Sequence, residues 1–298
     1  MLTLGTALQR LVPNPFYGIV TNPGVLSSST VTQGQLLRPY PHFGNMTIFN
    51  PTAASSSYHG LTLKVERRFA SGIGFLASYT TSKNISDAPA TVGPTVGHQN
   101  SYDRRADRSL VEEDIAQRLV ASASWELPFG RGKRLGDAWN APLDSALGGW
   151  QVNAIVSMQS GSPLALTTSP NTSRALGGVQ RPNSAGFSAK KSGPIQSRLD
   201  AFLDASAFSA PAPFTYGNAG RTLPDVRGPR FSNLDLSFVK TFRVKENLRL
   251  QFRGELFNAF NMPMFGLPNQ SFGARNFGMI TSQQNDPRQV QLALRLTF

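Results

Sequence analysis

The residues that could perform chemistry in this chain are few and scattered. Its three histidines, His42, His59 and His98, lie far apart, and none belongs to an HExxH motif or to a pair with metal-ligand spacing. The chain has no cysteine, which excludes disulfides and thiolate metal sites. The segment QSGSP at 159–163 lacks the GxSxG pattern of a nucleophile elbow. We therefore expect no catalytic residue, no cofactor, no metal site and no enzyme activity.

Two glycine-rich segments share part of the pattern of a phosphate-binding loop. FGRGKRLG at 129–136 does not fit GxxxxGK[ST], because Lys133 is followed by Arg134, so the segment favours a basic turn. GNAGR at 217–221 lacks GxGxxG. We interpret it as a loop that leads back to a strand.

The most charged segment is DRRADRSLVEED at 103–114. A loop on a rigid scaffold is a common place for ligand binding, which makes Arg104, Arg105 and Asp107 weak candidates for contacting a ligand or a divalent ion. The alternative, which the composition favours, is a solvated loop held by its own salt bridges. The sequence leaves both open.

The formal net charge of +12 raises the question of nucleic-acid binding. The basic residues are spread along the chain, however, and form only short clusters at 104–108, 131–134 and 190–191. A nucleic-acid surface normally concentrates its positive charge on one face. We expect no nucleic-acid partner.

The elements that would carry any site are strands with alternating apolar and polar residues. At the C-terminus, Val290, Leu292, Leu294 and Leu296 alternate with more polar residues, which is the period of a strand with one apolar face. With this one included, the alternation is found in seven segments, at 57–69, 72–84, 118–129, 148–159, 233–242, 248–260 and 290–298.

The lengths of the segments and of their connections indicate whether the apolar face lies in a soluble protein or against lipid. The segments run about 10 to 13 residues, against ~5 to 6 in globular sheets, and about 10 are needed for a tilted strand to cross a bilayer. Short turns at 70–72 and 243–247 alternate with long excursions at 85–114, 160–230 and 261–287, as in outer-membrane barrels. No apolar run reaches the ~20 residues of a membrane-spanning helix.

Aromatic residues of the apolar faces gather at the ends of the segments. Those at the short-turn ends predict one aromatic girdle at the membrane surface, and Tyr79 and Phe260 lie toward the long-loop ends. Two cations, Arg67 and Lys240, also fall on the apolar face, where we expect them to extend toward the interface. The predicted girdle residues are Phe69, Phe129, Trp150 and Phe242, joined by the terminal Phe298.

The segments together resemble a known family in sequence order. SYHGLTLKVERRF, QRLVASASWELPFGRGKR, LGGWQVNAIVSMQSGSP, NLDLSFVKTF, FRGELFNAFNMPMFG and DPRQVQLALRLTF resemble the C-terminal barrel region of TonB-dependent receptors, most closely the Oar-like group with a carboxypeptidase-regulatory-like domain. The resemblance implies an outer-membrane transporter driven by the TonB complex. It also implies that Phe298 is read by the barrel-assembly machinery.

From these observations we expect an all-β fold, an antiparallel transmembrane β-barrel of the outer-membrane type, present as a partial barrel of about seven strands. Residues 1–56 would be an extracellular loop region and 57–298 the C-terminal portion of the barrel, with Val290, Leu292, Leu294 and Leu296 facing outer-membrane lipid. We expect no plug, TonB-contacting segment, regulatory-like domain or signal peptide within these residues. The partners of the chain would instead include the plug and the remaining strands of a longer receptor. The substrate is not indicated. The alternative is a soluble β-sandwich that binds carbohydrate or serves in adhesion.

Overall fold

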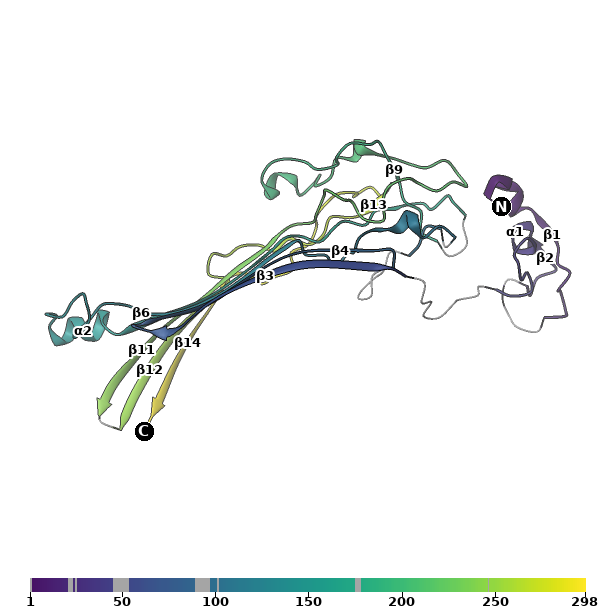
Figure 1. Cartoon of the computed structure of the whole chain (residues 1–298). Coiled ribbons are helices and arrows are strands. Elements are labelled where there is room, and N and C mark those ends of the chain that lie inside the picture. The colour runs from purple at the N-terminus through teal and green to yellow at the C-terminus, as the bar shows by residue number, and fades with distance from the viewer. Residues whose placement is uncertain are drawn as a thin grey trace.

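The computed structural model describes residues 2–20, 24, 26–44, 54–88, 97–100, 102–174, 178–245 and 247–298. Its main feature is one antiparallel sheet, in which seven long strands lie side by side in the order β14-β12-β11-β7-β6-β4-β3 (Figure 1). The short strand β5 pairs with β4. The strands are β3 (Ser56–Ala70), β4 (Ile73–Ser86), β5 (Ser109–Leu110), β6 (Gln117–Glu126), β7 (Trp150–Gln159), β11 (Phe231–Lys245), β12 (Leu248–Phe257) and β14 (Gln289–Thr297).

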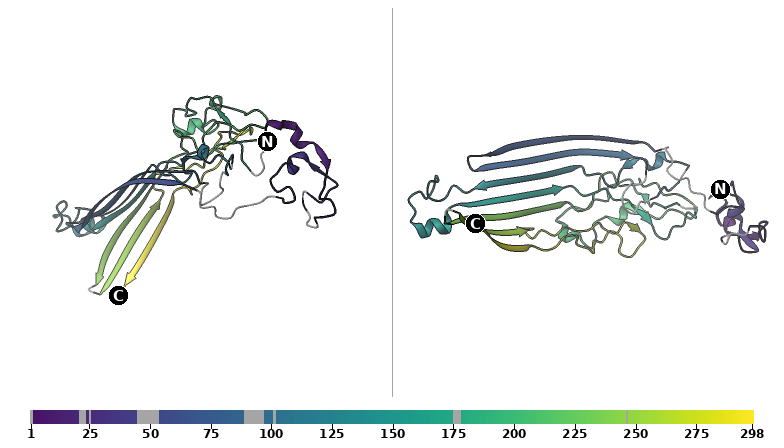
Figure 2. Two further views of the ribbon diagram at one scale, coloured as in Figure 1. Left: turned by 45° about the vertical axis from the view of Figure 1, so that its right-hand side comes forward. Right: turned by 90° about the horizontal axis from the view of Figure 1, so that it is seen from below.

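The sheet is curved and open. Strands β3 and β14 form its two edges and are not paired with each other (Figure 2). The described part of the chain is thus a partial barrel. Among the described residues, no helix is long and apolar enough to cross a membrane.

The strand register gathers the alternating apolar residues onto one face of the sheet. Directly opposite residues of neighbouring strands share a face. Leu63 pairs with Tyr79, Tyr79 with Leu119, and Leu119 with Met158. Across the other half of the sheet, Leu236 pairs with Leu256 and Leu256 with Val290. We call this side the apolar face and the opposite side the polar face.

The expected segments and the observed strands agree in position and differ at their ends. Strand β11 is longer than the segment 233–242, and β12 ends at Phe257, which leaves Phe260 outside the strand. Strand β6 ends at Glu126, so Phe129 also lies beyond its strand. A register shift between Arg67 and Ala70 marks a bulge beside the β3–β4 turn.

The long connections meet at one end of the sheet, opposite the end that carries α2 (Ala141–Leu147) (Figure 1). We name the described parts of 97–116, 160–230 and 258–288 the loop cap. Its short elements are η2 (Arg105–Asp107), β8 (Thr167–Thr168), β9 (Asn183–Ser184), η3 (Ile195–Arg198), η4 (Ala205–Ala207), β10 (Phe208–Ser209) and β13 (Ser271–Phe272). Strand β8 pairs with β13, which joins two of the long connections by backbone hydrogen bonds, and β9 pairs with β10 within 160–230.

The loop cap has a hydrophobic core of its own. Leu164 and Leu166 are 0% and 1% exposed, and the rings of Phe208, Phe272 and Phe277 contact one another edge to face. Burying aliphatic and aromatic side chains in this way stabilises a fold by roughly 1.5 to 3 kcal/mol for each large side chain. The cap is therefore a packed layer, which the polar composition of the long excursions did not predict.

The N-terminal residues form a small unit around a two-stranded hairpin. Strand β1 (Leu11–Pro13) pairs with β2 (Thr30–Thr32), and the helices η1 (Leu2–Gln9) and α1 (Gln33–Leu36) flank the hairpin. The buried Asn14 side chain donates to the carbonyl oxygens of Leu26 and Ser28, at 2.9 and 2.8 Å, and so closes the loop. The unit falls within 1–56, which we expected to be a loop region.

Candidate functional site

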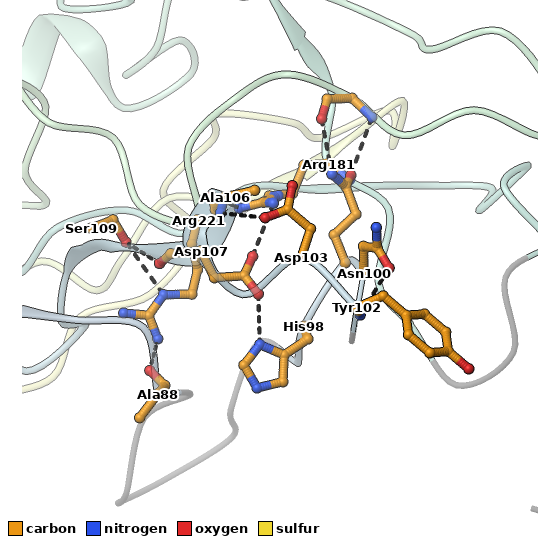
Figure 3. A network of polar contacts seen from close by, with 12 residues as sticks. Ala88, His98, Asn100, Tyr102, Asp103, Ala106, Asp107, Ser109, Arg181 and Arg221 are labelled. Atoms are coloured by element: carbon orange, nitrogen blue, oxygen red, sulfur yellow. Dashed lines mark hydrogen bonds and ion pairs between the residues drawn. The ribbon is translucent and has the colours of Figure 1, made fainter. Parts of the chain in front are cut away.

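The polar centre of the loop cap is the carboxylate of Asp107, on η2. Its Oδ1 lies 2.9 Å from Nη2 of Arg181, and its Oδ2 lies 2.6 Å from Nδ1 of His98 (Figure 3). The Asp107 and Arg181 side chains are 1% and 3% exposed. Burial lowers the pKa of the Arg181 guanidinium, and the adjacent Asp107 carboxylate opposes that shift. The pair is thus a desolvated ion pair that depends on both partners.

The Gln99 side chain links the backbone of Arg181 to the segment GNAGR. The Oε1 atom of Gln99 accepts from the backbone N–H of Arg181 at 2.8 Å, and Nε2 of Gln99 donates to the carbonyl oxygen of Gly217 at 2.9 Å. A side chain at Gly217 would place its Cβ 1.9 Å from the Arg181 carbonyl oxygen. This close approach explains why the first position of GNAGR is glycine.

The arginine of the same segment, Arg221, is fully buried and bonded to backbone of the β4 end. Its Nη2 donates to the Ser86 carbonyl oxygen at 2.9 Å, its Nη1 donates to the Ala88 carbonyl oxygen, and its Nε contacts the Ser109 hydroxyl at 3.3 Å. Burial lowers the pKa of Arg221, opposed by the charge of Glu112. Arg221 therefore fastens the long excursion to the sheet.

A second ion pair, Asp114 with Arg227, joins two of the long connections and the end of β4. Their Oδ2 and Nη2 atoms are 2.5 Å apart, and Nη1 of Arg227 donates to the Gly161 carbonyl oxygen at 3.2 Å. Asp114 Oδ1 also accepts from the backbone N–H of Asn84 at 2.6 Å. All these groups are engaged within the protein, so the cluster is built to hold loops in place.

The three candidate ligand residues of the charged segment have different environments. Asp107 lies in the interior, and Arg104 is part-buried with Nη2 3.9 Å from Asp87 Oδ1. Arg105 is exposed to solvent. Among the described residues, no group of three or more His, Cys, Asp or Glu could hold a metal ion. This arrangement agrees with the interpretation of an internally salt-bridged loop.

Sequence reasoning missed the partners in this cluster. The buried Arg181 and Arg221 and the partly buried Arg227 lie in a long polar excursion without any motif that marks such an arginine. Only the glycines of GNAGR signalled a close backbone approach. The other two histidines lie elsewhere: His42 contacts the rings of Phe16, Tyr40 and Phe43, and His59 is exposed on β3.

The basic turn FGRGKRLG binds carboxylates of the chain itself. The backbone N–H of Arg131 donates to Asp144 at 2.8 Å, and that of Gly132 donates to Asp137 at 2.8 Å. The turn amides that a phosphate would need are thus occupied. The helix that follows, α2, was not expected, although Asn140 caps it by accepting from the Leu143 N–H.

Two of the predicted girdle residues, Trp150 and Phe242, lie at the turn end of the apolar face, whereas the register shift between Arg67 and Ala70 takes Phe69 off that face. Trp150 and Phe252 contact edge to face, with ring centroids 6.0 Å apart. Phe242 and Trp150 flank the Lys240 ammonium, whose Nζ lies 5.1 and 5.5 Å from their ring centroids. Phe69 is in β3 beside the turn, and Phe129 forms an isolated bridge with Leu135.

We expected the Lys240 side chain to extend to the membrane interface, and the structure instead buries its ammonium against α2. Lys240 is 4% exposed, and its Nζ donates to the carbonyl oxygens of Gly148 at 2.5 Å and Asp144 at 3.4 Å. These carbonyls belong to the C-terminal end of α2, which attracts a positive charge. Lys240 therefore fastens α2 to the sheet. Arg67, in contrast, is exposed, and its Nη2 donates to the Ala70 carbonyl oxygen at 3.4 Å.

The four C-terminal residues that we expected to face lipid lie on the apolar face of β14. Val290, Leu292, Leu294 and Leu296 are between 56% and 70% exposed. Phe298 follows the end of β14 and is 95% exposed. A shallow apolar groove runs over Gly254, the position on β12 that has no side chain, and is lined by Trp150, Phe238, Phe252, Leu256, Val290 and Leu292.

Comparison with known proteins identifies one family. Residues 4–291 match a family model described as an outer membrane beta barrel domain. No curated protein and no solved structure matches the chain.

Proposed function

Because the chain belongs to the outer membrane beta barrel domain family, we propose that it is the C-terminal part of the barrel of an outer-membrane TonB-dependent receptor of the Oar-like type. Such a receptor would bind a substrate at the cell surface and import it by active transport. The chain would act without catalysis, and its partners would be outer-membrane lipid, a plug domain, further strands, the TonB complex and the barrel-assembly machinery.

One observation carries this proposal: the sheet exposes a continuous apolar face. Leu63, Tyr79 and Leu119 lie in line across one half of it, and Leu256 and Val290 across the other. In water such a face destabilises a monomer, whereas hydrocarbon solvates it, and the strands are long enough to cross a bilayer when tilted. The sheet is thus suited to form part of the wall of a transmembrane barrel.

The unpaired edges support membership in a larger barrel. An open sheet edge in hydrocarbon leaves backbone N–H and C=O groups without hydrogen bonds, at a cost of several kcal/mol for each group. Further strands against β3 and β14 would satisfy these groups. The Oar-like and TonB-dependent assignment rests on the ordered resemblance of the segments.

The loop cap supports a surface function. Its buried ion pairs and hydrophobic core hold the long connections in a fixed shape, and a fixed shape is what a binding surface needs. We place this cap on the extracellular side and α2 on the periplasmic side, because outer-membrane barrels have long extracellular loops and short periplasmic turns.

The alternative of a soluble β-sandwich is less well supported. A sandwich covers the apolar face of one sheet with a second sheet. In the described part of the chain, the remaining sheets are pairs of strands of two or three residues, too short to cover seven long strands.

The experiment is an immunoblot of separated cell fractions with an antibody against residues 102–114. We expect a band in the detergent-extracted outer membrane, with a mass above the 32.3 kDa of this chain. A buffer-soluble band near 32.3 kDa would refute the membrane assignment. Growth on candidate substrates with and without a functional TonB complex then tests energy-dependent uptake.

A further inference from the structure

The polar face of the sheet carries an arginine cluster on its three C-terminal strands. Arg249 and Arg253 lie on β12, Arg243 on β11 and Arg295 on β14. Arg243 pairs directly with Arg249, and Arg295 pairs with Gln251, midway between Arg249 and Arg253. All four therefore share the polar face, and all four are exposed.

The positive charge of this cluster is almost unbalanced. Glu255 is 3.7 Å from Arg253, and among the described residues no ion pair or side-chain hydrogen bond joins Arg243, Arg249 or Arg295 to a partner. On the opposite half of the face, Lys64 pairs with Glu66 at 3.1 Å, Lys133 of the turn after β6 pairs with Glu126 at 3.0 Å, and Arg118 is exposed. The four arginines lie on three adjacent strands, so their positive charges add up locally.

The arrangement opposes the stability of the sheet. Like charges directly opposite on neighbouring strands are destabilising, and Arg243 and Arg249 are such a pair, with Cα atoms ~5 Å apart in antiparallel geometry. A bound anion between them removes this repulsion. Guanidinium groups also bind carboxylate and phosphate with paired hydrogen bonds, which an ammonium does not.

We propose that Arg243, Arg249, Arg253 and Arg295 form a binding site for a water-soluble solute that carries several carboxylate or phosphate groups. The spacing sets the size of this ligand. Arg249 and Arg253 are four residues apart on one strand, about 13 Å, and Arg295 reaches over the position between them. A compact multivalent anion over Gln251 is within reach of three guanidinium groups.

A membrane phospholipid does not fit this cluster. Leu250, Phe252 and Leu294 alternate with the arginines and lie on the apolar face, so the arginines lie on the opposite side of the sheet. In the proposed function the polar face lines the barrel interior, and the anion would be the substrate or part of it. The role of the anion as a substrate rests on the proposed function. The binding of an anion by the arginine cluster does not.

The test uses the full chain refolded in an uncharged detergent, with tripolyphosphate and citrate as probes in a calorimetric titration. We expect tripolyphosphate to bind, with an affinity that falls as salt is raised. The double variant R249Q/R295Q should bind about tenfold more weakly or worse, since it loses charge-assisted hydrogen bonds. R249K/R295K keeps the charge and should lose less. R118Q removes an exposed arginine from the same face outside the cluster and should bind as the unchanged chain does.

Equal affinity of R249Q/R295Q and the unchanged chain would overturn the proposal, as would failure of both probes to bind. Binding of an acidic peptide where both probes fail would also overturn it, in favour of a polypeptide partner. Circular dichroism confirms that each variant has refolded, and R295Q alone replaces the double variant if the latter does not refold. Anion binding by a chain that is absent from the outer membrane would refute the proposed function alone.

Discussion

The loop cap and the sheet place apolar side chains in opposite surroundings. In the cap, Leu164 and Leu166 are 0% and 1% exposed, while on β14 Leu292 and Leu294 are 69% and 70% exposed. The cap also buries the ion pair of Asp107 with Arg181, whereas the sheet keeps Lys64 and Glu66 in the open. One chain therefore contains a region folded as proteins fold in water and a region suited to hydrocarbon.

The two regions owe their stability to different interactions. The cap is held by side chains that meet across long sequence distances, so its shape depends on a few buried contacts. The sheet is held by its ladder of backbone hydrogen bonds, and its apolar face gains stability from the solvent it meets. Substitutions in the two regions should accordingly fail for different reasons.

The largest expected effect comes from removing the buried carboxylate. Asp107→Asn should lower the free energy of opening of the cap by about 3 to 5 kcal/mol, because it leaves the Arg181 guanidinium buried without its counter-charge. Hydrogen–deuterium exchange of residues 178–184 measures this loss. Asp200→Asn, an exposed carboxylate of the same cap, is the control and should change little. Similar exchange in both variants would contradict the role of the ion pair.

The next largest effect tests the two faces of β14. Leu292→Arg puts a charge on the apolar face and should cost roughly 2 to 4 kcal/mol of folding free energy in lipid vesicles. Gln291→Arg puts the same charge on the polar face and should cost much less. Denaturant titration of the refolded chain in vesicles compares the two. If both cost the same, the assignment of the apolar face to lipid is wrong.

A smaller, local effect is expected at the turn end. Lys240→Met removes the ammonium that binds the Gly148 and Asp144 carbonyls, and hydrogen bonds from a charged group contribute about 1.5 to 3 kcal/mol. Amide exchange in 141–149 should therefore rise about tenfold or more. Lys245→Met, at an exposed lysine on the same strand, should leave this exchange unchanged.

The smallest effect is expected for an exposed ion pair. Lys64→Gln breaks the contact with Glu66, whose side chain is 52% exposed, and should change stability by less than about 1 kcal/mol. The vesicle titration used for β14 measures it. A loss as large as that of Asp107→Asn would show that exposed and buried charges contribute alike to the stability of this chain.

Most of the sheet could be predicted because alternation is a local property. The period of two places Val290, Leu292 and Leu294 on one face whatever the strand pairs with. The all-β partial barrel of the outer-membrane type is accordingly confirmed, by the observed sheet and by the family match over residues 4–291. The end of each strand was less predictable, because bulges and turns such as the shift at 67–70 depend on the partner strand.

The candidate site in the cap could be predicted only in part. The charged segment pointed to Asp107 and to internal salt bridges, but not to Arg181, Arg221 or Arg227. The lipid-facing and girdle roles of the sheet residues, and the TonB-dependent transport, stay predictions.

The strands, their apolar and polar faces and the absence of cysteine chemistry could be predicted from residue types alone, since each follows from the identity of a residue and its near neighbours. Which arginines are buried, and which of them lie together, depends on how the chain folds. Gln99 meets Arg181 across 82 residues, and Asp114 meets Arg227 across 113. Such contacts are properties of the folded chain, because the burial that makes the loss of one partner costly exists only once distant segments have packed together.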